Sequence, residues 1–249
     1  MSLLDLLRTQ PDLRVPEIAR TLGVSEGTVR NDLDALEEEG RLRRVHGGAV
    51  INSQDQFQNN SFLRRYEQNV AAKIAIAKEA ISLVENGDSI LLDASSTGYY
   101  FARMLSERQN LRVVTNGFEV ARELAQNPSN NVILIGGVVN NNSSSVSGLL
   151  SERIIEDLHI KKAFLSCSGF SLERGMTEIH LDEAQLKRKI IDSTELLFAL
   201  VDSSKFGVED MTSFARRDRI STLYTDSGIT NDWVEKLTQS NIPFKICNK

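Results

Sequence analysis

The chain has 249 residues, a mass of 27.8 kDa and a formal net charge of −5. Its 41% hydrophobic and 25% charged residues exclude an intrinsically disordered chain, and no run approaches the ~20 apolar residues of a membrane-spanning helix. The two cysteines are too few for a disulfide framework and the three histidines are scattered, so neither a metal site nor a cofactor is predicted. Because the N-terminus lacks the apolar core of a secretion signal, we expect a cytoplasmic protein.

The first 51 residues predict three short helices and a β-hairpin. Leucines close to the N-terminus form one apolar helical face. A second helix is expected from about Pro16 to Gly23, because proline suits a first helical turn and glycine a helix end. A third helix begins after Ser25, whose hydroxyl can cap free backbone N–H groups, and it ends at Gly40. Two short extended runs around a Gly-Gly turn then predict the hairpin.

This order of helix, tight turn, helix and hairpin predicts a winged helix-turn-helix domain over residues 1–51. Residues 1–50 sum to a charge of −2, yet arginines gather in the third helix and the hairpin, where they can reach the bases or phosphates of double-stranded DNA. The competing interpretation is a protein-interaction domain whose arginines are merely solvated. The predicted DNA-contacting residues are Ser25, Thr28, Arg30, Asn31, Arg43, Arg44 and His46.

Residues 52–68 begin with a stretch rich in Asn, Gln and Ser, which predicts a linker. Residues 69–249 then alternate between apolar extended runs and amphipathic helical stretches. This alternation predicts a mainly parallel, doubly wound α/β sheet with helices on both faces. The expected strands lie at 89–93, 112–115, 131–136, 162–166, 196–201, 221–225 and 243–247. The expected helices lie at 69–85, 97–107, 117–126, 148–157, 182–193 and 230–240.

Small polar residues and glycines follow five of the expected strands, at 93–97, 115–117, 136–137, 166–169 and 202–205. The first of these loops opens a helix, where free backbone N–H groups and small hydroxyl side chains form an anion site. Ligands of open parallel sheets bind beyond the carboxyl ends of the strands. Each loop alone is explained as a turn, but five together predict a ligand pocket.

Residues 22–25, 28–33, 36–37, 40 and 42–49 match the signature of a known family almost without a gap. The match continues at Phe62, Arg65, Asn69 and Lys73 and covers nearly the whole chain. On these residues the chain resembles the DeoR family of bacterial transcriptional regulators. The resemblance implies a sensor domain with the fold of ribose-5-phosphate isomerase, and a phosphorylated sugar as the ligand that relieves repression.

The strand-end loops map onto the matching family motifs, and this mapping gives the predicted effector site. The phosphate is expected to accept hydrogen bonds at the start of the helix near 97, with a lysine supplying the neutralising charge. The predicted effector-binding residues are Asp93, Ser95, Ser96, Thr97, Gly98, Thr115, Asn116, Gly136, Gly137 and Lys205.

Other polar segments leave alternatives open. Glu178, Asp182 and Glu183 either accept sugar hydroxyls or, for the latter two, form the charged first turn of a helix. Residues 187–189 lie further along that helix and are expected to form a solvated face. The polar run at 140–145 either folds over a ligand or only connects two elements.

The function that these observations favour is a DNA-binding transcriptional regulator, a repressor of a sugar-metabolism operon controlled by a phosphorylated sugar. The alternative is a sugar-phosphate isomerase-like enzyme with an appended DNA-binding domain, in which one of the three acids serves as the general base. The DNA-binding motif favours the regulator, a protein without turnover. Its expected partners are double-stranded operator DNA and the sugar phosphate, and the two-fold symmetry of operators predicts a homodimer or homotetramer.

Overall fold

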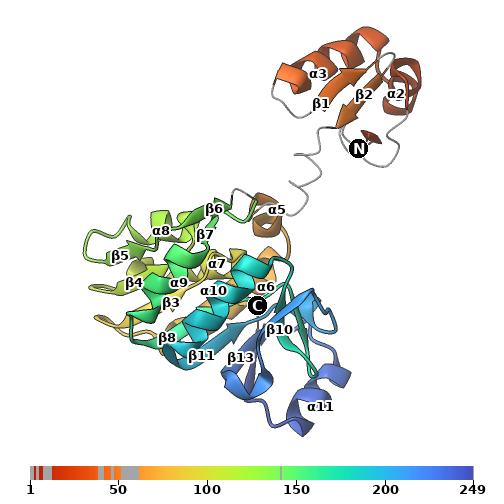
Figure 1. The fold of residues 1–249 in the computed structure, drawn as a ribbon. Helices are drawn as coiled ribbons and strands as arrows, with labels where there is room; N and C mark the ends of the chain where they lie inside the picture. The colour runs from red at the N-terminus through yellow and green to blue at the C-terminus, as the bar shows by residue number, and fades with distance from the viewer. Residues whose placement is uncertain are drawn as a thin grey trace. The chain divides into compact units, whose positions relative to one another are not determined.

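The computed structural model describes residues 3, 6–7, 13–38, 42–45, 48–51, 62–140 and 142–248 (Figure 1). The chain divides into two compact units, Met1–Ser61 and Phe62–Lys249, each with its own core. No helix within the described ranges is long and apolar enough to cross a membrane.

The first unit is built from two helices and a hairpin, together with the helical residues Leu3, Leu6 and Leu7. Its elements are α2 (Val15–Leu22), α3 (Glu26–Glu38), β1 (Leu42–Val45) and β2 (Gly48–Ile51). The turn between the helices depends on Gly23, which has a φ of 69°, a left-handed conformation that glycine adopts without strain. Ser25 caps α3, because its Oγ accepts a hydrogen bond from the Thr28 amide at 3.1 Å.

The apolar stripes of the two helices meet in a small core. Ile18 of α2 packs with Val29 and Leu33 of α3, and all three are fully buried. The hairpin, paired in antiparallel register with Leu42 opposite Ile51, contributes Leu42 and Ala49 to the same core. The predicted winged helix-turn-helix is confirmed.

The second unit is organised around a seven-stranded sheet in the spatial order β14-β13-β11-β8-β3-β4-β5, with every neighbouring pair parallel. Its strands are β3 (Ser89–Leu92), β4 (Arg112–Thr115), β5 (Asn131–Leu134), β8 (Ile160–Leu165), β11 (Thr194–Leu200), β13 (Ile220–Asp226) and β14 (Phe244–Cys247). The chain runs outward from β3 to β5 and then returns to the other side of β3. The order of the strands therefore reverses between β3 and β8.

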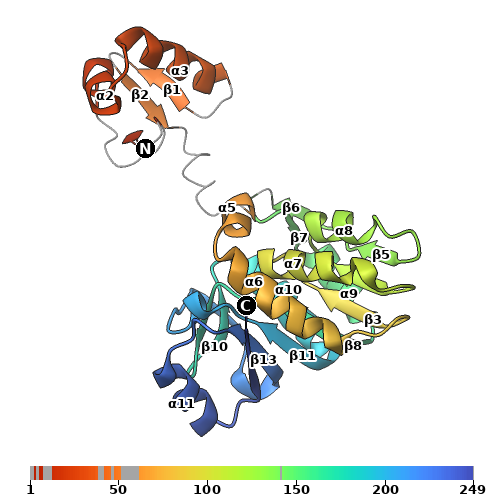
Figure 2. The same cartoon turned by 180° about the vertical axis from the view of Figure 1, so that it is seen from behind.

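Helices cover both faces of this sheet, as Figures 1 and 2 show from opposite sides. One face carries α6 (Val70–Ala80), α7 (Ser96–Met104) and α8 (Phe118–Leu124), and the other carries α9 (Leu149–Glu156), α10 (Leu181–Asp192) and α11 (Asn231–Gln239). Side chains alternate along a strand. Ile90 and Leu92 of β3 therefore pack into the core under α6, α7 and α8, and Leu91 packs into the core under α9, α10 and α11. The predicted doubly wound α/β fold is confirmed.

Several short elements were not foreseen by the sequence analysis. A hairpin of β6 (Val138–Asn140) and β7 (Ser145–Ser147) follows β5, and a second sheet orders its strands β12-β10-β9. The strands of this second sheet are β9 (Gly169–Ser171), β10 (Gly175–Glu178) and β12 (Thr212–Ala215). A short helix, α5 (Phe62–Glu67), lies in the stretch that the sequence assigned to the linker, while residues 52–61 of that stretch lie outside the described residues.

Candidate functional site

The start of α7 lies directly beyond the carboxyl end of β3, beside the point where the strand order reverses. Ser95 caps this helix: its Oγ accepts a hydrogen bond from the Gly98 amide at 2.9 Å and donates one to Asp93 Oδ1 at 2.6 Å. Gly98 is required here, because a Cβ at this position would lie 2.8 Å from the Asp93 carbonyl oxygen. Within the described part of the chain, the amides and hydroxyls of Ser96 and Thr97 make no hydrogen bond. The helix start therefore keeps free donors for an anion.

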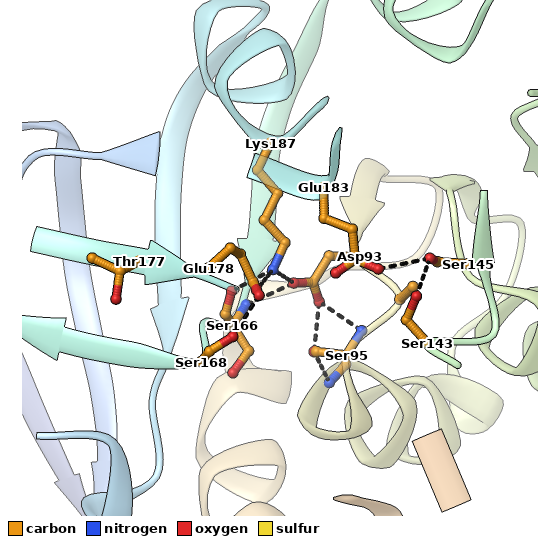
Figure 3. A network of polar contacts seen from close by, with 12 residues as sticks. Asp93, Ser95, Ser143, Ser145, Ser166, Ser168, Thr177, Glu178, Glu183 and Lys187 are labelled. Carbon is orange, nitrogen blue, oxygen red and sulfur yellow. Dashed lines mark hydrogen bonds and ion pairs between the residues drawn. The ribbon is translucent and has the colours of Figure 1, made fainter. Parts of the chain in front are cut away.

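A network of buried charges adjoins this helix start (Figure 3). Lys187 of α10 places its Nζ 3.0 Å from Asp93 Oδ2, 2.5 Å from Glu178 Oε1 and 2.8 Å from the Ser166 carbonyl oxygen. The second oxygen of each carboxylate is also engaged, since Ser95 donates to Asp93 and Ser168 donates to Glu178 at 2.5 Å. All three charged side chains are buried. The network therefore joins the loops after β3 and β8 to α10 and β10.

Opposite charges in this network keep Glu178 and Lys187 ionised although both are buried. Burial alone would raise the pKa of Glu178, but Lys187, the Ser168 hydroxyl and the charge of Arg65 hold that pKa below its ordinary value. Burial likewise opposes the charge of Lys187, but Glu178, Asp93 and Glu183 raise the pKa of its ammonium above the ordinary lysine value. The prediction that residues 187–189 form a solvated face was thus wrong for Lys187, whereas Arg188 is exposed. Cys167, in the loop after β8, is buried, and burial raises the pKa of its thiol, which makes it a poor nucleophile.

Four of the other predicted effector residues lie at the end of β4 and in the loops after β4 and β5. Thr115 and Asn116 are buried and bonded to the backbone: Thr115 Oγ1 accepts from the Gly117 amide, and Asn116 bridges the Ala94 amide to the Val146 carbonyl. Gly136 has open space where a Cβ would stand. Gly137, with a φ of 154°, admits no Cβ, because that atom would lie 2.2 Å from Ser151 Oγ.

The acids whose roles the sequence left open lie in different environments in the structure. Glu183 is buried, and its Oε1 accepts a hydrogen bond from Ser145 Oγ at 2.9 Å. Ser145 lies 2.6 Å from the hydroxyl of Ser143, so the polar run between β6 and β7 packs inward on α10 (Figure 3). Asp182 is exposed in the first turn of α10.

The loop after β11 brings a further cation toward this edge of the sheet. Lys205 is half-buried, and within the described residues its ammonium has no ion pair or hydrogen bond. Asp202, in the same loop, accepts hydrogen bonds from Ser204 and from the Asn69 side chain at 3.1 Å. Lys73 of α6 is buried close by, and its pKa is lowered to about 8, chiefly by burial and then by the charges of Lys205 and Arg65, against the opposing charge of Asp202.

The predicted DNA-contacting residues lie mainly on the outer face of α3. Thr28, Arg30 and Asn31 are exposed, and Arg30 pairs with Glu26 one turn earlier at 3.1 Å. Ser25 is also exposed at the start of the helix. Arg44 pairs with Asp34, and this contact ties β1 to α3. Arg43 lies opposite Val50 in the hairpin, and His46 falls outside the described residues.

A winged helix-turn-helix, a fold typical of DNA-binding proteins, followed by a separate α/β domain is the architecture of a two-domain transcriptional regulator. Comparison with known families gives the same class: residues 1–55 match the DeoR-like helix-turn-helix domain, and residues 68–227 match the DeoR C-terminal sensor domain. The chain belongs to the DeoR family of transcriptional regulators.

Full-length relatives agree with this assignment. The chain is 41% identical to the HTH-type transcriptional regulator GolR of Listeria innocua, over 98% of this chain and 96% of the relative. It is 33% identical to the lactose phosphotransferase system repressor of Streptococcus mutans, over 94% and 93%. It is 32% identical to an L-fucose operon activator of Haemophilus influenzae, over 96% of each.

Among solved structures, the chain is similar to a D-ribose-5-phosphate isomerase in complex with phospho-erythronic acid, with 16% identity and a TM-score of 0.40. The alignment covers 54% of this chain and 52% of the isomerase. The β subunit of eIF2B from Chaetomium thermophilum gives a TM-score of 0.45 at 14% identity, over 62% of this chain and 48% of that one.

The buried network yields a stability prediction. Replacing Lys187 with Met leaves Asp93 and Glu178 buried without their cation, which is expected to cost about 3–5 kcal/mol at pH 8. Without Lys187, burial raises the folded-state pKa of Glu178 above its unfolded value, so protonation of this carboxyl favours the folded variant. The deficit relative to the native chain should therefore narrow as the pH falls toward 5.

Urea unfolding, followed by the fluorescence of the single tryptophan, Trp233, measures this deficit in the second unit. Lys189→Met is the matched control, because Lys189 lies on the same helix as Lys187 and pairs near the surface with Glu156 of α9. Equal losses in the two variants, or a loss at Lys187 that does not depend on pH, would contradict the structural role of the network.

Proposed function

We propose that this DeoR-family regulator is a repressor of a sugar-metabolism operon, and that a phosphorylated sugar bound at the carboxyl edge of the sheet controls its binding to DNA. The observation that carries the proposal is the start of α7, where the donors of Ser96 and Thr97 stand free beside a fixed polar network. The similarity to the lactose phosphotransferase system repressor supports both the control of a sugar operon and the assignment as a repressor. The L-fucose operon activator is a relative that is named as an activator.

The isomerase alternative needs a free general base beside the substrate. Both oxygens of Glu178 are occupied by Lys187 and Ser168, and its pKa is held low, which suits a structural acid rather than a base. Glu183 is buried against Ser145, and Asp182 is exposed. These contacts disfavour turnover. Incubation with pentose and hexose phosphates separates the two functions, since the regulator binds its ligand without converting it.

The proposed DNA contacts divide into base recognition by α3 and backbone contact by the hairpin. We expect Arg30→Ala to relax base preference by ~1–3 kcal/mol at one position, because this exposed side chain of α3 can pair with a guanine. Arg44→Ala should instead weaken binding to all sequences alike and flatten the salt dependence by about one unit of slope. Operator titrations over a salt series measure both effects, and identical base preferences and slopes in the two variants would refute the division of roles.

The proposed effector site joins the phosphate to the start of α7. The phosphate accepts hydrogen bonds from the amides of Ser96 and Thr97, and Lys205 supplies a countercharge. The remaining predicted residues, Asp93, Ser95, Gly98, Thr115, Asn116, Gly136 and Gly137, shape the loops around it. Asp93, Ser95 and Asn116 do so through the hydrogen bonds that they already make.

Thr97→Glu tests this site, because the new carboxylate places a fixed negative charge where the phosphate is expected. The variant should still bind operator DNA but no longer release it when the cognate sugar phosphate is added. A fluorescence-anisotropy titration of operator DNA gives both quantities. Thr238→Glu on exposed α11 is the control. Undiminished release by Thr97→Glu, with unchanged ligand affinity, would place the phosphate elsewhere.

We further propose that the regulator acts as a homo-oligomer. Exposed apolar side chains gather on edge strand β5, on β6 and at the start of α9, where Gly148 adjoins Val138. The group comprises Ile133, Val138, Val139, Leu149, Leu150 and Ile154, with Val138 69% exposed. A second copy of the chain is the partner proposed for this patch, because a two-fold operator requires two DNA-binding units and an isologous contact pairs one patch with itself.

Val138→Asp is expected to weaken this self-association, because it places a charge in the patch. Sedimentation of the variant should show a larger fraction of monomer than the native chain at the same concentration. Met211→Asp serves as the control, since Met211 is exposed outside the patch. An unchanged distribution of oligomers in Val138→Asp would show that this patch is not the interface.

A further inference from the structure

Arg65, in the second unit, has a guanidinium group to which the site described above gives no hydrogen bond at Nε or Nη2. It lies on α5, the helix that directly follows residues 52–61 in the chain. Two nitrogens of its guanidinium, Nε and Nη2, are buried, and no hydrogen-bond acceptor among the described residues reaches either of them. A buried donor without a partner is costly, so such a group in a native structure calls for a partner that the described residues do not supply.

The nearby carboxylates do not supply that partner. The charge of Arg65 acts on Glu178, yet both oxygens of Glu178 are engaged, by Lys187 and by Ser168. The loop after β11 offers Asp202, whose Oδ1 already accepts from Asn69 and Ser204. Neither carboxylate reaches the buried Nε or Nη2 of Arg65, which no described acceptor contacts.

The two unpartnered nitrogens define the shape of the missing acceptor. Nε and Nη2 lie on one edge of the guanidinium and present two roughly parallel N–H donors. Such a fork matches two oxygens of a phosphate or carboxylate, whereas a single carbonyl oxygen or water satisfies it less well. The acceptor that fits is an anion with paired oxygens.

Contacts from three elements fix α5 next to the effector site. Lys73 of α6 donates from its Nζ to the carbonyl oxygens of Arg65 and Gln68. Tyr100 of α7 donates to the Tyr66 carbonyl at 3.2 Å, and the two rings stack with centroids 5.1 Å apart. The Phe62 amide donates to the Asn142 carbonyl, in the turn between β6 and β7, at 2.8 Å. Figure 1 places α5 beside β6 in agreement with this last bond.

We propose that Arg65 is a direct ligand of the effector's anionic group, so that α5 forms part of the effector site. This inference rests on the proposed function, since it takes the sugar phosphate as the anion. It adds a contact that the strand-end loops do not provide. The phosphate then lies between the start of α7 and the fork of Arg65, and its binding holds α5 against the second unit.

Calorimetric titration of the full-length protein with inorganic phosphate, and then with a panel of sugar phosphates, tests this contact. Arg65→Gln should bind the anion about 10- to 100-fold more weakly, the loss expected for a charge-assisted pair of hydrogen bonds. Arg65→Lys keeps the positive charge but lacks the paired N–H donors. Its affinity for the anion should therefore lie between the affinities of the native chain and of Arg65→Gln. Arg64→Gln makes the same change of charge at an exposed position of the same helix and should bind as the native chain does.

A second measurement separates binding from a structural role of Arg65. In the native chain, addition of phosphate should shift the ¹⁵Nε–¹H signal that disappears in Arg65→Lys. Thermal melting without ligand shows whether each variant is folded. If the native chain binds neither phosphate nor any sugar phosphate, the proposed function fails. If the native chain binds and folded Arg65→Gln binds equally well, or if the Arg65 signal does not move, then water alone satisfies the guanidinium and this inference is overturned.

Discussion

The shared ammonium of Lys187 is the contact on which the arrangement of the second unit's polar edge depends. It joins Asp93 at the end of β3, Glu178 on β10 and the Ser166 carbonyl beyond β8. These groups come from two different sheets, and each is buried, so none can leave the others without exposing an uncompensated charge to an apolar interior. Because α7 begins three residues after Asp93, the position of its free amides follows from the same contact.

The hydrogen bonds of Asp93 and Glu178 determine which polar groups remain available at the carboxyl edge of the main sheet. Carboxylates that are occupied by Lys187 and by serine hydroxyls neither take a proton from a substrate nor compete for the remaining cations. The donors without partners among the described residues include the amides at the start of α7, the ammonium of Lys205 and the Nε and Nη2 of Arg65. Such an edge is suited to holding an anion.

Hydrophobic periodicity was sufficient to predict the seven strands of the main sheet and the six helices that cover it, because each strand contains closely spaced apolar residues and most of the helices are amphipathic. It did not predict β9, β10 and β12, which have three or four residues each and mix apolar residues with small or polar ones. It also misplaced Lys187, because a lysine within a basic run is typical of a solvated helix face. Only the folded chain brings Asp93, 94 residues earlier, against it. The assignment of residues 62–68 to the linker had a similar cause, since α5 gains its partners from α6, α7 and the β6–β7 turn.

Under the proposed function, the dependence of α5 on distant partners provides a means by which an effector controls the protein. A ligand shifts an equilibrium only by its difference in affinity between two states, and inverting a 99:1 ratio takes a ~10⁴-fold difference. An anion held by α7 alone binds equally well whether or not α5 is docked. A helix of six residues is unstable by itself, so α5 exists through its contacts with Lys73, Tyr100 and Asn142. An anion that also bonds to Arg65 favours the docked state, and α5 is the element through which the chain continues toward the DNA-binding unit.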